Sequence, residues 1–335
     1  MIILTTGISG AGGKEYLKKF AEFARTKGKK VRVYNIGELM FEHASSAGIS
    51  INKKNVLNTN PNVLNSLRGA ALEKALSSCN LDDADGDLIV INMHAVFFWK
   101  KIFIRAFEKY YINKINPDMI ITFIDNSTSI KAQLDSREQW KEEQMTEDDI
   151  LIWQSVEVEM TASFSEFENK PFYVLPVRHS PELLYKLAFH PRMEPVYVSI
   201  PMTHSSPESV SKIDNFINRL NRYFSVFDPR TIEINVDAPT KNKTIYYQTI
   251  NRDLYWLIKQ SNKVVGYFPE IVASSGVINE LREGYETNKE VWLVFPSSKR
   301  SPFTDYFTTK LFETEEELFS FVREYIKGKY GIEVN

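Results

Sequence analysis

Short apolar runs rich in β-branched residues alternate along the chain with longer segments of mixed polarity. Runs of this kind are typical of strands buried in a parallel sheet, and the segments between them are typical of covering helices. We therefore expect an α/β protein built on parallel sheets. The expected strands are residues 1–6, 30–35, 87–92, 118–124 and 171–176, then one from Val196, one ending near Phe227, residues 263–268 and one before Pro296.

A change of composition near residue 190 divides the chain. Residues 189–195 carry the prolines and polar side chains of a linker, and a new strand begins directly after them. Two domains are also the natural expectation for 335 residues. We expect a first domain over residues 1–188, a linker over 189–195 and a second domain over 196–330.

Composition narrows the classes of function. A formal net charge of -2 gives no electrostatic case for a general nucleic-acid binder. The single cysteine, Cys79, excludes an intrachain disulfide framework and suits a reducing compartment. No apolar run approaches the roughly 20 residues that cross a bilayer, and the first residues lack the basic region of a signal peptide. We therefore expect a cytoplasmic protein with no membrane partner.

A glycine-rich turn follows the first expected strand and ends in Gly12-Gly13-Lys14. Glycines in such a turn let successive backbone N–H groups face phosphate oxygens, with a helix N-terminus behind them. The spacing from Gly7 to Gly12 agrees with the phosphate-binding pattern G-x-x-x-x-G-K-[ST]. Gly13 stands where the pattern has its lysine, and Lys14 stands where it has the magnesium-binding hydroxyl.

Three segments, TGISGAGGKE, YNIGELMFEHA and INMHA, resemble in this order the motifs of the archaeal type of adenylate kinase. The resemblance spans residues 1–187 and implies a P-loop kinase-like, three-layer domain with a parallel sheet. It places residues 35–42 near a bound monophosphate and makes ATP with Mg²⁺ candidate ligands. The residues that it places around a phosphate are Gly7, Gly10, Gly12, Gly13 and Lys14.

The same region departs from the kinase pattern. Asn92 replaces the acid that helps to hold the metal in that family, and the expected lid offers Lys131, Arg137 and Lys141 among many acids. Phosphoryl transfer depends on cations that neutralise the transferred group. We expect a nucleotide-binding or structural domain in preference to a working kinase. A plain strand-to-helix turn without nucleotide is the competing interpretation.

The strongest chemical signal lies between residues 251 and 296. The pattern predicts a helix with Asp253, a buried strand, a loop ending Ser274-Ser275-Gly276, a helix with Glu280 and another buried strand. A carboxylate four residues past a Ser-Gly turn, at the end of a parallel sheet, is placed to meet a sugar or a phosphate. Glu283 and Glu286 follow at helical spacing, and we expect them at the surface.

Together with the segment VYVSIPM, this block resembles the nucleoside 2-deoxyribosyltransferases and the related 2'-deoxynucleoside 5'-monophosphate N-glycosidases over residues 195–300. The resemblance implies a flavodoxin-like or Rossmann-like domain with Glu280 as the nucleophile at the anomeric carbon. It implies that Asp253 contacts the sugar and assists proton transfer. The substrate contacts that it implies are Tyr197, Ser199, Pro201, Met202, Ser274, Ser275 and Gly276.

Two carboxylates are what this chemistry needs. Cleavage of an N-glycosidic bond passes through an oxocarbenium-like state that one carboxylate traps, while a second group handles the proton of the departing base. No cofactor is required. The transferases tend to carry Asp at the Ser274 position, so Ser274 favours a nucleotide over a free nucleoside. A solvated helix acid is the competing interpretation of Glu280.

The remaining candidates depend on an oligomer or on single histidines. In the related families a neighbouring subunit helps to close the site, so Lys299, Arg300 and Ser301 are candidates to hold phosphate across a homodimer or larger homo-oligomer. An exposed loop is the alternative. His94 and His204 could line the two sites, or be satisfied by backbone and solvent. No Cys/His cluster has metal-ligand spacing, so we predict no metal site.

The favoured function is hydrolysis or transfer of the glycosidic bond of a nucleoside 5'-monophosphate, with small-molecule nucleotides as partners. One alternative is a glycohydrolase of NAD or a related dinucleotide, which would release nicotinamide. Another is a nucleotide sensor in which both domains bind and neither turns over. A residual kinase would show as ADP formed from ATP and a monophosphate.

Overall fold

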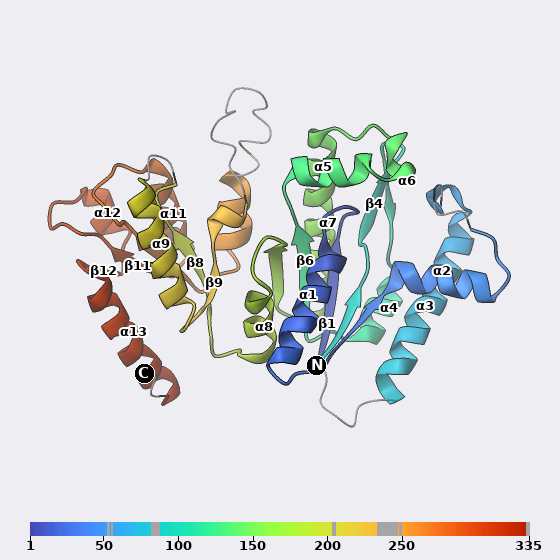
Figure 1. The fold of residues 1–335 in the computed structure, drawn as a ribbon, viewed down its shortest axis with the longest axis horizontal. Helices are drawn as coiled ribbons and strands as arrows, with labels where there is room; N and C mark the ends of the chain where they lie inside the picture. The colour runs from blue at the N-terminus through green and yellow to red at the C-terminus, as the bar shows by residue number, and fades with distance from the viewer. Residues whose placement is uncertain are drawn as a thin grey trace. The chain divides into compact units, whose positions relative to one another are not determined.

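The computed structural model describes residues 1–51, 54, 56–81, 88–202, 206–232, 247 and 250–332. The chain divides into two compact units, Met1–Pro181 and Glu182–Asn335 (Figure 1). The expected linker, residues 189–195, lies inside the second unit. Helix α8 (Pro181–Phe189) precedes this segment and forms a hydrogen bond within the same unit. The buried Lys186 Nζ donates to the carbonyl oxygen of Asn221 at 2.5 Å.

The first unit contains a five-stranded sheet with the order β2-β3-β1-β6-β7. All of its strand pairs are parallel, which confirms the expected fold class. The apolar runs of the sequence form these strands because β1, β3 and β6 are covered on both faces and almost entirely buried. The strands are β1 (Ile2–Gly7), β2 (Val31–Asn35), β3 (Leu88–Asn92), β6 (Met119–Ile124) and β7 (Phe172–Pro176).

The long polar segment before β7 forms three helices. The last, α7, begins at a capping box in which Thr146 and Asp149 satisfy each other's backbone N–H groups, and it ends at Asn169 in the left-handed conformation. α7 contacts β1, β6 and β7. The helices of the unit are α1 (Gly13–Thr26), α2 (Ile36–Ser46), η1 (Val56–Asn58), α3 (Pro61–Leu81), α4 (Lys109–Ile115), α5 (Ser127–Asp135), α6 (Glu138–Lys141) and α7 (Glu147–Glu168).

A hairpin of β4 (Val96–Trp99) and β5 (Ile102–Arg105) follows β3. Its two-residue turn places Lys100 and Lys101 at φ angles of 51° and 59°. Turns of this kind usually carry Asn or Gly, for which positive φ is less costly. The lysine pair therefore gives no turn signal in the sequence, and the hairpin was not among the expected elements.

The second unit contains a five-stranded sheet with the order β12-β11-β10-β8-β9, again parallel throughout. The strands are β8 (Pro195–Ser199), β9 (Ser225–Phe227), β10 (Lys263–Tyr267), β11 (Glu290–Val294) and β12 (Lys310–Phe312). After α8, the helices are α9 (Pro207–Leu220), η3 (Pro229–Thr231), the π-helix η4 (Arg252–Ile258), α11 (Ser275–Glu286), α12 (Pro302–Tyr306) and α13 (Glu315–Tyr330).

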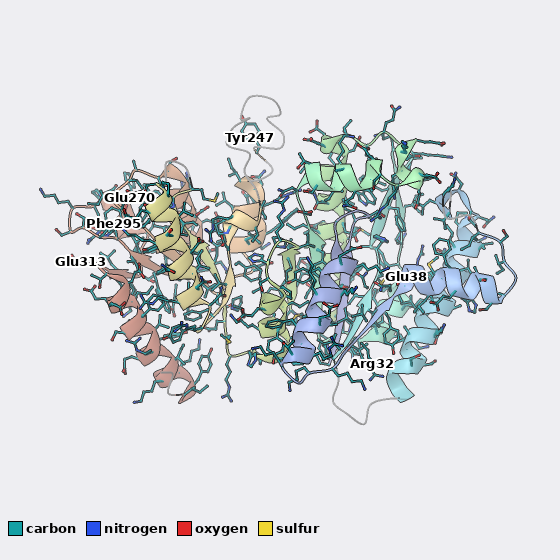
Figure 2. The ribbon with its side chains drawn as sticks, in the orientation of Figure 1. Arg32, Glu38, Tyr247, Glu270, Phe295 and Glu313 are labelled. Atoms are coloured by element: carbon teal, nitrogen blue, oxygen red, sulfur yellow. The ribbon has the colours of Figure 1, made fainter. Side chains whose placement is uncertain are left out.

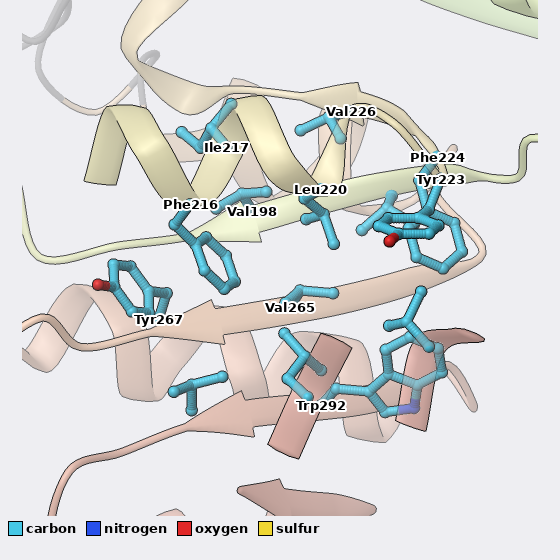
Figure 3. Close-up of a cluster of buried hydrophobic side chains, with 14 of the residues drawn as sticks. Val198, Phe216, Ile217, Leu220, Tyr223, Phe224, Val226, Val265, Tyr267 and Trp292 are labelled. Atoms are coloured by element: carbon cyan, nitrogen blue, oxygen red, sulfur yellow. The ribbon is translucent and has the colours of Figure 1, made fainter. Parts of the chain in front are cut away.

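One core of the second unit lies between its sheet and the helices α9 and α13 (Figure 3). Phe216 of α9 stacks on Tyr267 of β10 with ring centroids 4.1 Å apart, and Trp292 of β11 is fully buried. The first unit also has buried apolar clusters against its sheet and helices, and Figure 2 shows the side chains of both units on the ribbon. No helix in the described part of the chain has the length and hydropathy needed to cross a membrane.

Helix α11 lies unusually close to the sheet. A Cβ atom added at Gly284 would come within 2.7 Å of Val264 Cγ2 and 3.2 Å of Val291 Cγ2. On the strand side, a Cβ at Gly266 would lie 3.1 Å from Leu281 Cδ2. Only glycine permits this approach, which fixes the distance between α11 and the face of the sheet.

Substituting Gly284→Ala should lower the free energy of unfolding of the second unit by about 1–3 kcal/mol, because the added methyl group overpacks the contact with β10. Gly328→Ala is the matched control, since Gly328 also lies in a helix but no atom lies within 4 Å of its added Cβ. That control should raise stability by roughly 0.5–1 kcal/mol. Urea unfolding checks both signs, and equal effects of the two substitutions would contradict the packing argument.

Candidate functional site

The phosphate loop joins β1 to α1. Gly10 and Gly12 adopt φ angles of 87° and 80°, where a side chain would be strained. The loop encloses a cavity of about 200 Å³ together with the ends of β2 and β3. The cavity is lined by all five loop residues that the sequence singled out, Gly7, Gly10, Gly12, Gly13 and Lys14.

Gly13, at the start of α1, is closed to any side chain. Its added Cβ would lie 2.8 Å from Cδ2 of Phe123, a buried ring on β6. The next residue, Lys14, forms an exposed ion pair with Glu38 of α2. The hydrogen bond from Lys14 to Glu38 raises the pKa of the lysine. An exposed pair of this kind contributes about 0–1 kcal/mol, so an anion in the cavity can compete with Glu38 for the ammonium group.

Asn92 ends β3 directly between Thr5 of β1 and Asn35 of β2. Thr5 Oγ1 donates to Asn92 Oδ1 at 3.0 Å, and Asn92 Nδ2 donates to Asn35 Oδ1 at 2.9 Å. Both polar groups of the Asn92 side chain are therefore engaged in a row of hydrogen bonds across three strand ends.

Two titratable side chains hold the first loop glycine from behind. The Gly7 N–H donates to Glu157 Oε1 at 3.0 Å, and the Gly7 carbonyl oxygen lies 2.5 Å from His94 Nδ1. Glu157 of α7 also accepts from the N–H groups of Ala95 and Val96, each at 2.8 Å. Burial raises the pKa of Glu157 to about 7 and lowers the pKa of His94 to about 4. The lowered pKa favours the neutral imidazole. Because the Gly7 carbonyl oxygen can only accept, the Nδ1–H group of His94 is the donor of this hydrogen bond.

Sequence reasoning missed Glu157, which lay unmarked among the acids of a polar segment. It identified His94 only as an open alternative, and the structure places His94 in the lining of the cavity. Of the three expected lid cations, Arg137 lines the cavity, whereas Lys131 pairs with Asp135 at 2.9 Å and Lys141 does not reach the lining.

The second site gathers at the carboxyl end of β8. Tyr197 and Ser199 are two residues apart on β8, so their side chains face the same side of the sheet. Both residues are fully buried. The Tyr197 hydroxyl donates to Glu280 Oε1 at 2.9 Å, and the Ser199 hydroxyl donates to Glu280 Oε2. Burial raises the pKa of Glu280 to about 7, and these two hydrogen bonds act in the opposite direction. The pair of hydroxyl donors thus binds both carboxylate oxygens of the half-buried Glu280.

The loop before α11 presents backbone donors. Ser274 is the N-cap of the helix, and its hydroxyl accepts from the Val277 N–H at 3.3 Å. Among the described residues, no acceptor faces the N–H groups of Ser275 and Gly276. An added Cβ at Gly276 would meet only Ser274 Oγ, at 3.9 Å, so Gly276 leaves open space beside the first turn.

Other expected site residues are less completely placed. Pro201 is buried directly after β8, and Met202 packs against the core of the second unit. The backbone of Asp253 lies in η4, which contacts β8 and α11, but its side chain lies outside the described part. His204 lies outside the described residues altogether.

The basic loop after β11 is folded back on itself. Arg300 Nε donates to Asp305 Oδ1 at 2.8 Å, and Arg300 Nη1 donates to the carbonyl oxygen of Ser297 at 2.6 Å. Ser301 is the N-cap of α12, and Lys299 is exposed. Within the described residues, no group of three or more acids, histidines and cysteines is arranged to hold a metal ion.

Residues 6–151 match the family model described as "AAA domain". An adenylate kinase from Thermococcus onnurineus (strain NA1) is 29% identical over 120 residues, which are 36% of this chain and 57% of the relative. The chain thus spans little more than half the length of that curated relative. The N-terminal region is a P-loop kinase-like domain, as its loop motif and order of segments predicted.

Two solved structures match part of the chain. One is the crystal structure of a conserved protein from Enterococcus faecalis V583, with a TM-score of 0.32 and 12% identity over 40% of this chain and 99% of that chain. The other is a 2-deoxyribosyltransferase from Bacillus psychrosaccharolyticus, with a TM-score of 0.32 and 18% identity over 38% of this chain and 95% of that chain.

Replacing the Glu280 carboxylate by an amide should stabilise the second unit in a pH-dependent way. The folded-state pKa of about 7 exceeds the ordinary value of 4.5, so the folded state favours the protonated form. The stability that this protonated carboxyl contributes is complete below pH 4.5 and is lost as the pH rises through 7. Glu280→Gln keeps a neutral side chain, and should exceed wild type by about 1–3 kcal/mol above pH 7.

The measurement is urea unfolding on both sides of this range, using the transition that Gly284→Ala shifts. Glu283→Gln is the matched control one turn along α11, because its carboxylate has no hydrogen-bond partner among the described residues. A stability difference between Glu280→Gln and wild type that stays constant with pH would rule out a raised pKa.

Proposed function

We propose that the second unit cleaves the N-glycosidic bond of a nucleoside 5'-monophosphate, with Glu280 as the nucleophile. The observation that carries this proposal is the Glu280 carboxylate, enclosed and held by Tyr197 and Ser199 at the carboxyl end of a parallel sheet. Ligands of open parallel sheets bind at this edge. An enclosed acid with a strongly raised pKa at such an edge is a candidate for catalysis.

The reaction proceeds in two steps. The Glu280 carboxylate attacks the anomeric carbon, and the C–N bond breaks with its electron pair passing to the base nitrogen, which takes a proton from Asp253. Water then attacks the same carbon of the glycosyl ester, gives its proton to Asp253 and frees the carboxylate. A second base in place of water turns the hydrolysis into a transfer. The proposed reaction uses no cofactor.

The donors around Glu280 suit a carboxylate that must change partners. A hydroxyl group rotates at little cost, so Tyr197 or Ser199 can release the oxygen that bonds to carbon while the other donor holds the remaining oxygen. Because Glu280 lies on α11, which the contact at Gly284 holds against β10, its carboxylate is fixed in position without a rigid hydrogen bond.

The start of α11 supports a phosphate on the substrate. The N–H groups of Ser275 and Gly276, which have no acceptor among the described residues, lie at the positive end of the helix, little more than one turn before Glu280. A 5'-phosphate there would place the sugar between the helix and β8. The Ser274 hydroxyl accepts from the Val277 N–H and keeps its own proton to donate, so it can bind the same phosphate beside the backbone N–H groups.

The first unit is proposed to bind a nucleotide without transferring its phosphoryl group. The phosphate loop, its cavity and the match of residues 6–151 support nucleotide binding. Lys14 is paired with Glu38, so it is not positioned as the cation of a kinase reaction. Asn92 stands where a kinase has its metal-binding acid, and its side chain is already hydrogen-bonded.

Base release should depend on Glu280. Wild type, Glu280→Gln and the control Glu283→Gln are incubated with a panel of ribo- and deoxynucleoside monophosphates and NAD, and free base and nicotinamide are separated by chromatography. Glu280→Gln should lose about three orders of magnitude in rate because it removes the nucleophile, and the control should match wild type. Nicotinamide in place of a base would move the assignment to a dinucleotide glycohydrolase. Absence of any product would leave a nucleotide sensor.

The rate should also follow the ionisation of Glu280. Attack requires the carboxylate, so the acid limb of the kcat/KM profile should rise as the pH passes through about 7. Ser199→Ala removes one donor to the charged form and should move the midpoint upward by about one pH unit. Ser211→Ala, an exposed serine that bonds only the Pro207 carbonyl, is the control. A midpoint that both alanine variants share with wild type would exclude Glu280 as the titrating group.

A further inference from the structure

We infer that the first unit binds its nucleotide as a metal-free anion, held by the loop N–H groups and Arg137, where P-loop kinases bind the Mg²⁺ complex. The inference rests on the proposal that this unit binds a nucleotide, and it adds the state of that ligand. The ligand is metal-free because the residues around the cavity do not provide the oxygen ligands that Mg²⁺ needs.

The oxygen ligands that Mg²⁺ needs are missing from their usual places. Mg²⁺ demands near-octahedral oxygen coordination, usually from one or two carboxylates or hydroxyls together with phosphate and water. The hydroxyl position of the loop is occupied by Lys14. At the acid position, the Asn92 Oδ1 atom accepts from Thr5 and the amide donates to Asn35. Both standard contributions are therefore replaced by groups that do not offer an ionised oxygen.

The nearby carboxylates do not make up the loss. Glu157 lies behind the loop and uses both oxygens to accept three backbone N–H groups, and Glu38 is paired with Lys14. Glu15 is exposed and lines the cavity beside Lys14, whose ammonium group would repel a divalent cation at that place. Glu15 is the carboxylate that the experiment has to test.

The cavity instead offers what a free phosphate needs. The loop presents backbone N–H groups, and Arg137 reaches the lining from the segment before α6 without an ion-pair partner among the described residues. A guanidinium group binds phosphate with paired N–H donors and needs no metal. Gly13 cannot gain the lysine of the standard pattern, because Phe123 closes the space above it. Arg137 therefore takes the role of the fixed cation.

Isothermal titration of the full-length chain with ADP tests this, in Glu280→Gln protein so that the second unit does not turn over. ADP should bind with excess EDTA at least as tightly as in millimolar magnesium chloride. Arg137→Ala should weaken the EDTA titration by about tenfold, the loss expected for one charge-assisted hydrogen bond. Lys141→Ala, at an exposed lysine of α6 that does not line the cavity, should leave it unchanged.

Three results would overturn the inference. Tighter binding of ADP with Mg²⁺ would show that the cavity takes the metal complex, and loss of that gain in Glu15→Gln would name the ligand. Equal effects of Arg137→Ala and Lys141→Ala would remove the assigned cation. Failure of ADP to bind in either buffer would remove nucleotide binding by the first unit, while base release by the second unit is measured separately and stands or falls by itself.

Discussion

A carboxyl group withdrawn from water costs several kcal/mol to ionise unless donors surround it, and each unit of this protein has one such group at its strand ends. In the first unit Glu157 meets three backbone N–H groups, and in the second Glu280 meets two hydroxyls. Backbone donors cannot turn away, so Glu157 fixes the phosphate loop against the segment after β3. Hydroxyl donors can rotate, so Glu280 can exchange them for an atom of a ligand. A carboxyl group at the strand ends therefore has fixed donors in one unit and donors that can turn away in the other.

The sequence predicted those elements whose local residue pattern agrees with the way they are buried in the fold. Apolar β-branched runs became strands because both faces of each parallel sheet are covered. Two of the loop glycines, Gly10 and Gly12, lie at positions of positive φ. Glu280 was singled out from its place after a Ser-Gly turn, whereas Tyr197 and Ser199 were named only through the family resemblance. Their hydrogen bonds to Glu280 are a finding of the structure.

Three features had no local signal. Glu157 acts on Gly7 across 150 residues, so only the folded sheet identifies it. The β4–β5 hairpin turns on two lysines at positive φ, where sequence patterns require Asn or Gly. Helix α8 has the same amphipathic pattern whichever sheet it covers, and the chain cannot show that Lys186 reaches Asn221 until α9 is in place.

The position of α8 has a practical consequence for separating the two units. A fragment that begins at Val196 would lack the Lys186 ammonium group, which donates to the backbone carbonyl oxygen and the side-chain oxygen of Asn221, the C-cap residue of α9. A fragment that begins at Glu182 keeps this contact and also the Glu182 carboxylate that pairs with Lys186 at 3.0 Å. The apparent boundary in the sequence is therefore a poor place to cut the chain, and the division between the units lies one helix earlier.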